Sequence, residues 1–523
     1  MQQLKKKTRD SWGTRLGVIM AVAGSAIGLG NFLRFPAKAA SNGGGAFMIP
    51  YFLALLLLGI PLMWIEWTLG RYGGGFGHGT APGIFHSVWQ KNRFIKYFGV
   101  IGIFGPLVIF IYYTYIEAWT LAYSFFALTG KYTAISDQAG MQGFLRGFQG
   151  LEHNQYFHGI GTAYIFFLVT FVANIGVIYY GIRGGIERVC KWALGILFIF
   201  GFFLLVRVVT LGAPDAAKPD WNVLNGFGFL WNPDFSALKN AKVWLEAAGQ
   251  IFFTLSVGIG VILTYASYLS KGDDVVLSGL TAASTNELAE VILGGSIVIP
   301  AAFVFFGPAN MKTIAHSGVF NLGFVTMPFV LNKLPLAPLF GFFWFFLLFL
   351  AGITSSISLA QPAVAFLEDE FDTSRKKAVW LFAAISFILC QPAIFFLKNG
   401  VVDELDFWGG TLFLVVFAVE VILFAWVFGM ETAWDEIHKG ADMRIPKVYK
   451  FIIKYITPLF LFLILGMWLW QEWIPIIFMQ KVSASDRPFI LGTRIGLITI
   501  FLTLALLVRI AWRRKRAQLE KIR

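Results

Sequence analysis

The segment GVIMAVAGSAIGLGNFLRFP, residues 17–36, is apolar and about long enough to cross a bilayer, but small and polar residues interrupt its middle. The interrupting residues are Gly24, Ser25, Gly28, Gly30 and Asn31. Each glycine costs a helix about 1 kcal/mol relative to alanine. A break inside the membrane leaves backbone N–H and C=O groups unpaired, so it persists only where a neighbouring helix, water, an ion or a substrate binds them. We favour a broken helix whose freed backbone binds a substrate and sodium.

The composition indicates a polytopic membrane protein, because 57% of the 523 residues are hydrophobic and only 14% are charged. We predict an all-α integral membrane protein with about twelve transmembrane helices, each at least about 18 residues long. The predicted spans are residues 16–38, 46–70, 97–128, 160–182, 189–212, 244–269, 276–306, 337–366, 378–397, 407–429, 450–475 and 490–511.

The net charge of +13 is distributed over connections and ends rather than gathered on one surface, which argues against a nucleic-acid partner. Basic clusters precede the first span, follow the last and lie in even-to-odd connections: Lys5–Lys7, Arg9, Arg15, Lys91–Lys96, Arg183–Lys191, Arg375–Lys377 and Arg513–Arg516. The positive-inside rule then places both termini in the cytoplasm. The start also resembles a signal peptide, but its apolar run continues, so we expect no cleavage. Neither the two cysteines nor the six histidines suggest a disulfide framework or a metal site.

The sixth predicted span repeats the interruption of the first. In GQIFFTLSVGIGVILTYASYLS, residues 249–270, Ser256, Gly258 and Gly260 again lie at the centre. Interrupted spans at corresponding places in two halves predict an inverted repeat with a binding site near the bilayer midplane. We therefore expect one transporter domain over residues 1–523, with repeats at 16–212 and 244–429 and two further spans at 450–511. The alternative is that these glycines only permit close helix packing.

Other polar residues interrupt the seventh and eighth spans. Asn286 and Glu290 are one helical turn apart, and Thr354 and Ser355 follow in the eighth span. Carboxylates inside a membrane mark ion pathways or buried pairs, and hydroxyl and carbonyl oxygens suit a hard cation such as sodium. The alternative for Thr354 and Ser355 is that their hydroxyls bond back to their own helix.

The sequence resembles the neurotransmitter:sodium symporter family, and within it the bacterial leucine transporters, from Arg9 to beyond Trp408. The matching segments include AIGLGNFLRFP, NGGGAFMIPY, IPLMWIEW, GRYGGGFGHGT, IYYTYIEAW, GQIFFTLSVGIG, LSGLTAASTNELAEVILGGSI, AGITSSISLAQP and DELDFWGGT. The resemblance implies a 5+5 inverted repeat with broken helices 1 and 6. It also implies a sodium-coupled symporter of the prokaryotic cytoplasmic membrane that imports an amino acid by alternating access. It implies no enzyme activity.

The resemblance implies two sodium ions and a substrate held by the broken helices. The first sodium site would use Ala26, Asn31, Thr254 and Asn286. The second would use Gly24, Ile27, Ala351, Thr354 and Ser355. The substrate would contact Ala26, Gly30, Ile109, Tyr113, Phe253, Thr254, Ser256, Ile259, Ser355 and Leu359.

Two substitutions in this pattern bear on the substrate. Aminergic members carry an aspartate where this chain has Gly28, which favours an amino acid. Ile259 replaces a phenylalanine of the leucine transporters, which enlarges one wall of the pocket. A pocket discriminates one methylene by only about 1–3 kcal/mol. We therefore expect a bulky, neutral, hydrophobic amino acid that resembles leucine, with methionine or an aromatic amino acid as alternatives.

The family pattern also implies gates and an anion substitute. Arg34 and Asp406 could pair on the external side, and Arg9, Trp12, Tyr268 and Asp369 could close the cytoplasmic side. Glu290 stands where chloride-dependent relatives have a neutral residue, which implies transport without chloride and allows proton countertransport.

Two other function classes stay open at this point. A channel or an amino-acid sensor could keep the same site without pumping. An intramembrane enzyme is the weaker rival, because no nucleophile with its base stands out. A homodimer is compatible with the sequence but not required by it.

Overall fold

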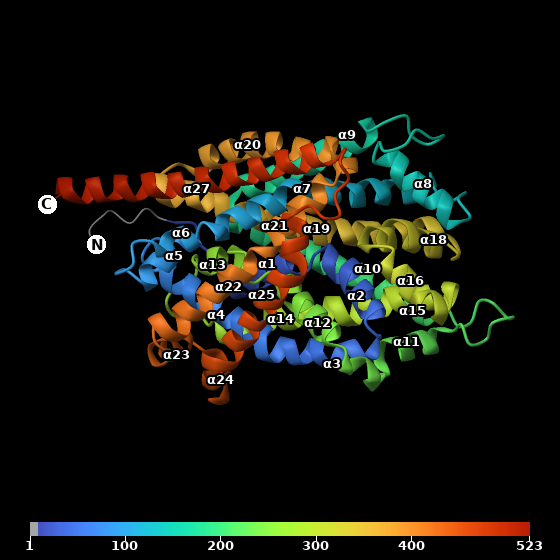
Figure 1. Cartoon of the computed structure of the whole chain (residues 1–523), viewed down its shortest axis with the longest axis horizontal. Coiled ribbons are helices and arrows are strands. Elements are labelled where there is room, and N and C mark those ends of the chain that lie inside the picture. Colours follow the sequence, from blue (N-terminus) through green and yellow to red (C-terminus); the bar gives the residue numbers. More distant parts are fainter. Residues whose placement is uncertain (1–8, 523) are drawn as a thin grey trace.

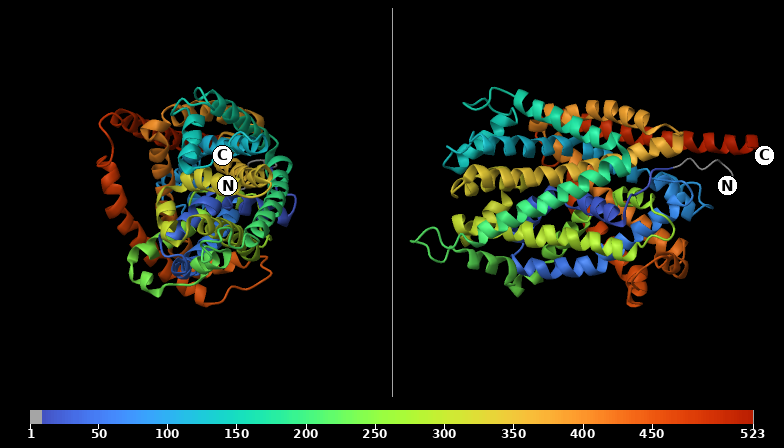
Figure 2. Two further views of the ribbon diagram at one scale, coloured as in Figure 1. Left: turned by 90° about the vertical axis from the view of Figure 1, so that its right-hand side faces the viewer. Right: turned by 180° about the vertical axis from the view of Figure 1, so that it is seen from behind.

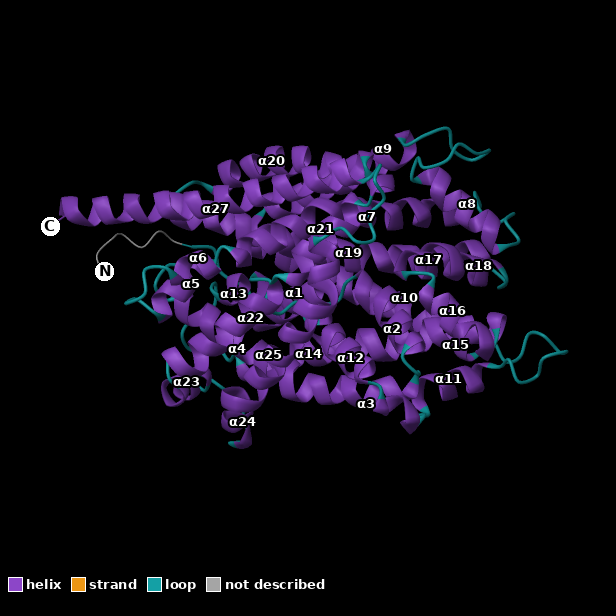
Figure 3. Ribbon diagram, viewed as in Figure 1, coloured by secondary structure: helices purple, strands orange, loops and turns teal. Residues whose placement is uncertain are grey.

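The computed structural model describes residues 9–522, without the side chains of residue 472 and residues 518–522. The basic residues Lys5–Lys7 lie outside this range. Within it the regular structure is helical apart from an isolated bridge between Gly44 and Pro233, and Figure 3 shows helices joined by loops. The predicted all-α fold is confirmed.

Ten helices in the described range are long and apolar enough to cross a membrane, and a bent pair makes an eleventh. The ten are Gly45–Gly74, Ile95–Leu128, Gly161–Tyr179, Ile182–Val209, Val276–Phe306, Ala337–Phe371, Arg375–Phe395, Val401–Val427, Val448–Ile477 and Arg487–Ala517. The predicted sixth span is present as two shorter helices, α12 (Ala241–Thr254) and α13 (Val261–Ala266), separated by a break. Together these elements account for the twelve predicted spans, with ends that differ by a few residues.

The first span breaks in the middle of residues 17–36. Helix α1 (Arg15–Ala26) begins at Thr14, whose hydroxyl caps it by accepting from the Gly17 amide at 3.0 Å. Ile27 adopts an extended conformation after α1. The chain resumes at η1 (Gly30–Arg34), a π-helical turn that continues into α2 (Phe35–Ser41), and the two halves meet at 48°.

The sixth span breaks over a longer stretch because three residues have left-handed backbones. Their φ angles are +52° at Ser256, +72° at Gly258 and +85° at Gly260. A Cβ on Gly260 would lie 2.2 Å from the carbonyl oxygen of Gly102 on α7 (Ile101–Leu128), so only glycine fits there. Ser256 has no such freedom, and its strained backbone costs about 1–2 kcal/mol.

Side chains from other helices bind the backbone that the breaks release. The Gly258 amide donates to Glu66 of α4 (Ile60–Gly74), and the Leu29 amide donates to the Tyr113 hydroxyl at 3.1 Å. The Gly28 amide donates to Asn31 Oδ1 at 2.9 Å. The breaks are therefore built into the fold, because side chains bind the amides that they release.

The two breaks lie in the middle of the bundle. Helices α7 and α19 (Ala337–Phe371) pack along one another, and α1 packs against α19 and against α14 (Val276–Glu287). Figure 1 shows α1, α14 and α19 at the centre of the molecule. Helix α25 (Thr457–Trp468) lies at the rim, as the end-on view of Figure 2 shows, and its outer face is largely exposed.

The first described residues and the last helix share one end of the molecule. Arg9 pairs with Asp369, and Lys515 of α27 (Arg487–Ile522) pairs with the adjacent Glu370. This end also carries α5 (Ala81–Val88) and α6 (Ile95–Phe98). Short helices that the sequence did not reveal cover the opposite end in Figure 1: α8 (Gln138–Phe148), α11 (Val223–Trp231), α16 (Met311–His316) and α18 (Met327–Asn332).

Candidate ion and substrate site

Oxygen atoms from three helices converge beside the first break. The side-chain oxygen of Asn286 lies 3.3 Å from the carbonyl oxygen of Thr254 and 3.3 Å from that of Ala26. Such oxygens repel one another unless a donor or a cation lies between them. There are two ways to relieve this repulsion. The Asn286 side-chain amide can turn so that its NH₂ group donates to the two carbonyls. Alternatively, the three oxygens can together bind a hard cation. Three of the four residues predicted for the first sodium site, Ala26, Thr254 and Asn286, thus present oxygens that fit such an ion.

Asn31 takes a different orientation from the one that the first predicted site implies. Its Nδ2 donates to Asn286 Oδ1 at 2.8 Å and to Thr254 Oγ1 at 3.2 Å. Its Oδ1 accepts from the Gly28 amide, so this oxygen holds the break of the first span. Asn31 is adjacent to the cluster, but its amide oxygen points away from it.

A second group of oxygens gathers around Ser355 of α19. Its hydroxyl lies 3.4 Å from the Gly24 carbonyl oxygen, 3.4 Å from that of Ile27 and 3.0 Å from that of Ala351. The Thr354 hydroxyl lies 3.1 Å from the Ala351 carbonyl oxygen. All five residues predicted for the second sodium site therefore meet. Both hydroxyls bond back to their own helix, as the alternative interpretation states, and Ser355 also reaches the frayed end of α1.

The hydroxyls of Tyr113 and Ser355 pack closely on Gly28, between the two breaks. A Cβ on Gly28 would lie 3.0 Å from the Tyr113 hydroxyl and 3.0 Å from the Ser355 hydroxyl, so a larger residue here would displace them. The Leu29 amide points at the Tyr113 hydroxyl, and the Ser256 hydroxyl donates to the Ser25 carbonyl at 2.9 Å. Amides that face outward at the start of a half-helix favour an anion such as a carboxylate.

The apolar residues predicted for the pocket lie on the helices that carry Tyr113 and Ser355 or beside the break of the sixth span. Phe253 packs against Gly30, where a Cβ would be 2.5 Å from its ring. Ile109 faces Gly409 of α21 (Val401–Thr411), where a Cβ would be 3.1 Å from Ile109. Leu359 is buried, and Ile259 is half-buried. These side chains present aliphatic and aromatic surface.

Glu290 lies behind the first oxygen cluster with donors on both carboxylate oxygens. Oε1 accepts from the Tyr51 hydroxyl at 3.0 Å and from Gln250 Nε2 at 2.9 Å. Oε2 accepts from the hydroxyl of Thr254. Three neutral donors around one buried carboxylate form a cradle for a negative charge. The Tyr51 hydroxyl also lies 2.7 Å from Glu287 Oε2, so the two carboxylates share its one proton.

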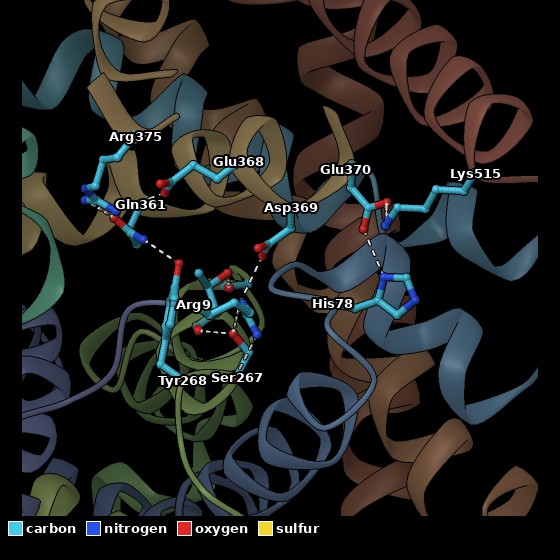
Figure 4. Close-up of polar contacts among 12 residues, drawn as sticks. Arg9, His78, Ser267, Tyr268, Gln361, Glu368, Asp369, Glu370, Arg375 and Lys515 are labelled. Carbon is cyan, nitrogen blue, oxygen red and sulfur yellow. Dashed lines mark hydrogen bonds and ion pairs between the residues drawn. The ribbon is translucent and has the colours of Figure 1, made fainter. Parts of the chain in front are cut away.

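Three residues of the gate predicted for the cytoplasmic side, Arg9, Tyr268 and Asp369, lie together (Figure 4). Arg9 binds Asp369 at 2.9 Å and the Ser267 carbonyl at 3.1 Å, and its guanidinium lies 4.6 Å from the centre of the Tyr268 ring. Trp12 donates to the Tyr265 carbonyl at 3.0 Å. Burial lowers the pKa of Arg9, but the charges of Asp369 and Tyr268 and the hydrogen bonds to both together outweigh burial and raise the pKa above its usual value. The arginine therefore remains charged.

Arg34 and Asp406, the gate pair predicted for the external side, do not form an ion pair in this structure. The Arg34 guanidinium lies over Phe253, 4.2 Å from its ring centre. Asp406 accepts instead from the hydroxyl of Tyr112. Arg34 therefore covers the pocket through an aromatic contact, while Asp406 is bound to α7.

Two groups of buried polar residues were missed by the sequence interpretation. Glu117 contacts Asn174, and Glu66 holds the Gly258 amide beside Glu420. These glutamates are completely buried. A carboxylate inside an apolar span is a readable signal, so a search for every intramembrane charge would have found them.

Comparisons with known proteins identify the family to which this chain belongs. The sequence profile of the sodium:neurotransmitter symporter family matches residues 9–137 and 133–480. An uncharacterised sodium-dependent transporter of Methanocaldococcus jannaschii is 33% identical over 461 residues, covering 87% of this chain and 89% of the relative. Sodium-dependent nutrient amino acid transporter 1 of Drosophila melanogaster is 27% identical over 517 residues, covering 87% of this chain and 77% of the relative.

A solved structure is also similar. The crystal structure of MhsT in complex with L-phenylalanine superposes with a TM-score of 0.73 at 29% identity, covering 87% of this chain and all of MhsT. The fold is thus that of a transporter, and these related proteins are transporters rather than enzymes.

Proposed function

Because this chain belongs to the sodium:neurotransmitter symporter family, we propose that it imports a bulky, neutral, hydrophobic amino acid together with two sodium ions. The observation that carries the proposal is the pair of oxygen clusters at the broken spans, one around Asn286 and one around Ser355. The first would also contact the substrate carboxylate, which gives sodium binding and substrate binding a physical link.

Sodium entry can drive accumulation of the substrate. Two sodium ions that move inward gain about 2 × 2.3 kcal/mol per 100 mV, while a zwitterion carries no net charge across. A tenfold sodium gradient adds about 1.4 kcal/mol per ion. The sum of about 7 kcal/mol corresponds to a substrate gradient above about 10⁴-fold for tight coupling.

The pocket supports an amino acid with a large apolar side chain. Gly28 leaves no carboxylate to bind an amine substrate, while Tyr113 and the amides after the break supply donors for a carboxylate. Ile259 offers more room than a phenylalanine would. MhsT, at 29% identity, was solved with L-phenylalanine. We therefore propose a leucine-like substrate, with methionine and aromatic amino acids as competitors.

The transport cycle would be alternating access between two inverted repeats, residues 16–212 and 244–429. The breaks in the first and sixth spans occupy corresponding places in these halves, which supports the repeat. The end that carries Arg9 and Lys515 would face the cytoplasm, because basic residues gather there. Bacterial and archaeal relatives support a prokaryotic inner membrane as the location. A dimer could form but is not needed to complete the site.

Glu290 supports transport without chloride. Its carboxylate already occupies the cradle of Tyr51, Gln250 and Thr254 beside the first cluster. A fixed negative charge at this place would compensate a sodium ion without an added anion. Uptake should stay unchanged when gluconate replaces chloride, and a collapse of uptake would refute this part of the proposal.

The decisive experiment measures labelled leucine in proteoliposomes with an inward sodium gradient, and then with potassium in place of sodium. Sodium-dependent accumulation is expected, with competition by leucine, methionine, tyrosine and tryptophan exceeding that by alanine. Binding without accumulation would indicate a sensor, and preference for alanine would refute the substrate class.

A pair of variants tests the second sodium site in the same assay. Thr354→Val removes one hydroxyl of the Ser355 cluster and should raise the sodium concentration for half-maximal uptake by about tenfold, or about 1.4 kcal/mol. Ser386→Ala removes an equally buried hydroxyl from α20 (Arg375–Phe395), remote from both clusters, and should leave uptake unchanged. Equal effects of both variants would contradict the site.

A further inference from the structure

Glu117 is a buried carboxylate that belongs to none of the sites described above. It lies on α7 one turn after Tyr113, and its side chain is inaccessible to solvent. Carboxylates at membrane depth are costly and are retained where they have a defined partner. Asn174 of α9 (Gly161–Tyr179) is that partner: its Nδ2 donates to the two carboxylate oxygens at 3.2 and 3.1 Å.

The contact continues from Asn174 to α19. The hydroxyl of Ser356 donates to Asn174 Oδ1 at 2.5 Å. Ser356 directly follows Ser355, around which the second oxygen cluster gathers. Hydrogen bonds thus connect α7, α9 and α19 just behind that cluster. Because hydrogen bonds have direction, this connection resists rotation of α19 in a way that apolar packing does not.

Glu117 also contacts α19 one turn earlier. A Cβ on Gly352 would lie 2.9 Å from Glu117 Cγ, so α19 rests directly on this side chain. Gly352 and Ser356 are four residues apart and face the same side of α19. Ala351 directly precedes Gly352, and Thr354 and Ser355 lie between Gly352 and Ser356. The residues that contact Glu117 and Asn174 therefore alternate along α19 with the residues of the second cluster.

We propose that Glu117, acting through Asn174 and Ser356, is a positioning residue for the second sodium site. It sets the rotation of α19 so that the oxygens of Ala351, Thr354 and Ser355 face the carbonyls at the end of α1. One residue turns a helix by about 100°, so a rotation by a fraction of that angle would move both hydroxyls away. This inference rests on the proposed sodium-coupled function.

The experiment measures binding of labelled leucine to the purified full chain while sodium is varied. In Glu117→Ala the sodium concentration for half-maximal binding should rise by about tenfold, which corresponds to about 1.4 kcal/mol. At saturating sodium, the leucine affinity of Glu117→Ala should return to within about twofold of the wild-type affinity, a difference of about 0.4 kcal/mol. Glu117→Gln keeps an acceptor for Asn174 and should restore the wild-type sodium curve.

Ser356→Ala removes the last bond of the connection, together with a bond from the same hydroxyl to the Ile353 carbonyl of its own helix, and should raise the sodium requirement by about threefold, or about 0.7 kcal/mol. Ser386→Ala is the matched control and should have no effect, because its hydroxyl bonds only within α20. If Glu117→Ala does not fold, Ser356→Ala and Glu117→Gln decide the question.

Three results would overturn the inference. The first is an unchanged sodium curve in Glu117→Ala and Ser356→Ala. The second is a sodium requirement in Glu117→Gln that is as high as in Glu117→Ala, because the effect would then come from the negative charge of Glu117 and not from its hydrogen bonds. The third is a loss of leucine affinity that saturating sodium does not restore. A wild-type protein without sodium-dependent binding would instead refute the proposed function itself.

Discussion

The two ends of the candidate transport path are closed by different kinds of contact. At the proposed cytoplasmic end, the segment before α1 is bound by charged and hydrogen-bonded groups: Arg9 to Asp369, Asp10 to the Ile182 amide, Trp12 to Tyr265, and Gly13 and Thr14 to Glu187. At the external end, Arg34 lies over Phe253, and Asp406 binds Tyr112.

The difference indicates which end opens at lower cost. Hydrogen bonds to charged groups contribute about 1.5–3 kcal/mol each, whereas a cation–π contact contributes about 0.5–1 kcal/mol at exposed sites. The cytoplasmic contacts also connect elements that are far apart in sequence, so they must break together. The end that carries Arg9 is therefore held closed by more contacts between distant segments than the end that carries Arg34.

The largest expected effect comes from Arg9→Ala. Removing one partner of a mostly buried pair costs about 3–5 kcal/mol, and both side chains of this pair are less than one-fifth exposed. We expect the cytoplasmic path to open. The measurement is maleimide labelling of Ser358→Cys, one turn below Ser355, in a background with Cys190 and Cys390 replaced by alanine.

The labelling rate from the cytoplasmic side should rise by at least about tenfold, or about 1.4 kcal/mol. Arg146→Ala is the control, because it removes an arginine from an exposed pair with Glu152 at the other end. An unchanged labelling rate in Arg9→Ala would show that this ion pair does not hold the path closed.

A smaller effect should follow from removing residues 512–523. Lys515 binds Glu370 at 2.7 Å, His78 binds the other oxygen of Glu370 at 2.9 Å, and Trp512 stacks on the His78 ring. Figure 4 shows Glu370 between Lys515 and His78, next to Asp369. The deletion should raise labelling of Ser358→Cys by about threefold, or about 0.7 kcal/mol.

A shorter deletion, residues 517–523, keeps Trp512 and Lys515 and serves as the control for this experiment. It should leave the labelling rate as in the full chain. Equal rates in both deletions would mean that the end of α27 contributes nothing to the closed cytoplasmic side.

The smallest effect is expected for the coupling between Arg34 and Asp406. Without substrate, Arg34→Ala and Asp406→Ala should act independently on labelling from the external side, because the residues have different partners. With leucine bound, a coupling of about 0.5–1 kcal/mol would indicate that the pair forms over the substrate. A strong coupling without substrate would contradict the arrangement described here.

Much of the fold could be read from the chain because the bilayer restricts the possible structures. Backbone groups in hydrocarbon must be paired, so apolar runs of sufficient length become helices, and their glycine interruptions become breaks. Gly28, Gly258 and Gly260 therefore predicted where the first and sixth spans would open. The family resemblance then indicated which oxygens would gather there, and the structure brings most of them together.

The remaining features depended on contacts between distant segments. Arg34 lies over Phe253 rather than beside Asp406, and no local sequence pattern predicts this choice. Either neighbour would give the guanidinium a favourable electrostatic contact. The helices that cover the external end are short and lack the long apolar signal of a span.

The polar contacts among Glu117, Asn174 and Ser356 join three spans separated by more than 50 residues, as do those between Lys515 and Glu370. Hydrophobic periodicity reports which face of a helix is buried, but not which side chain it meets there. Local sequence therefore specified the membrane helices and their breaks, whereas helix packing selected the partners that position the ion site and close its two ends.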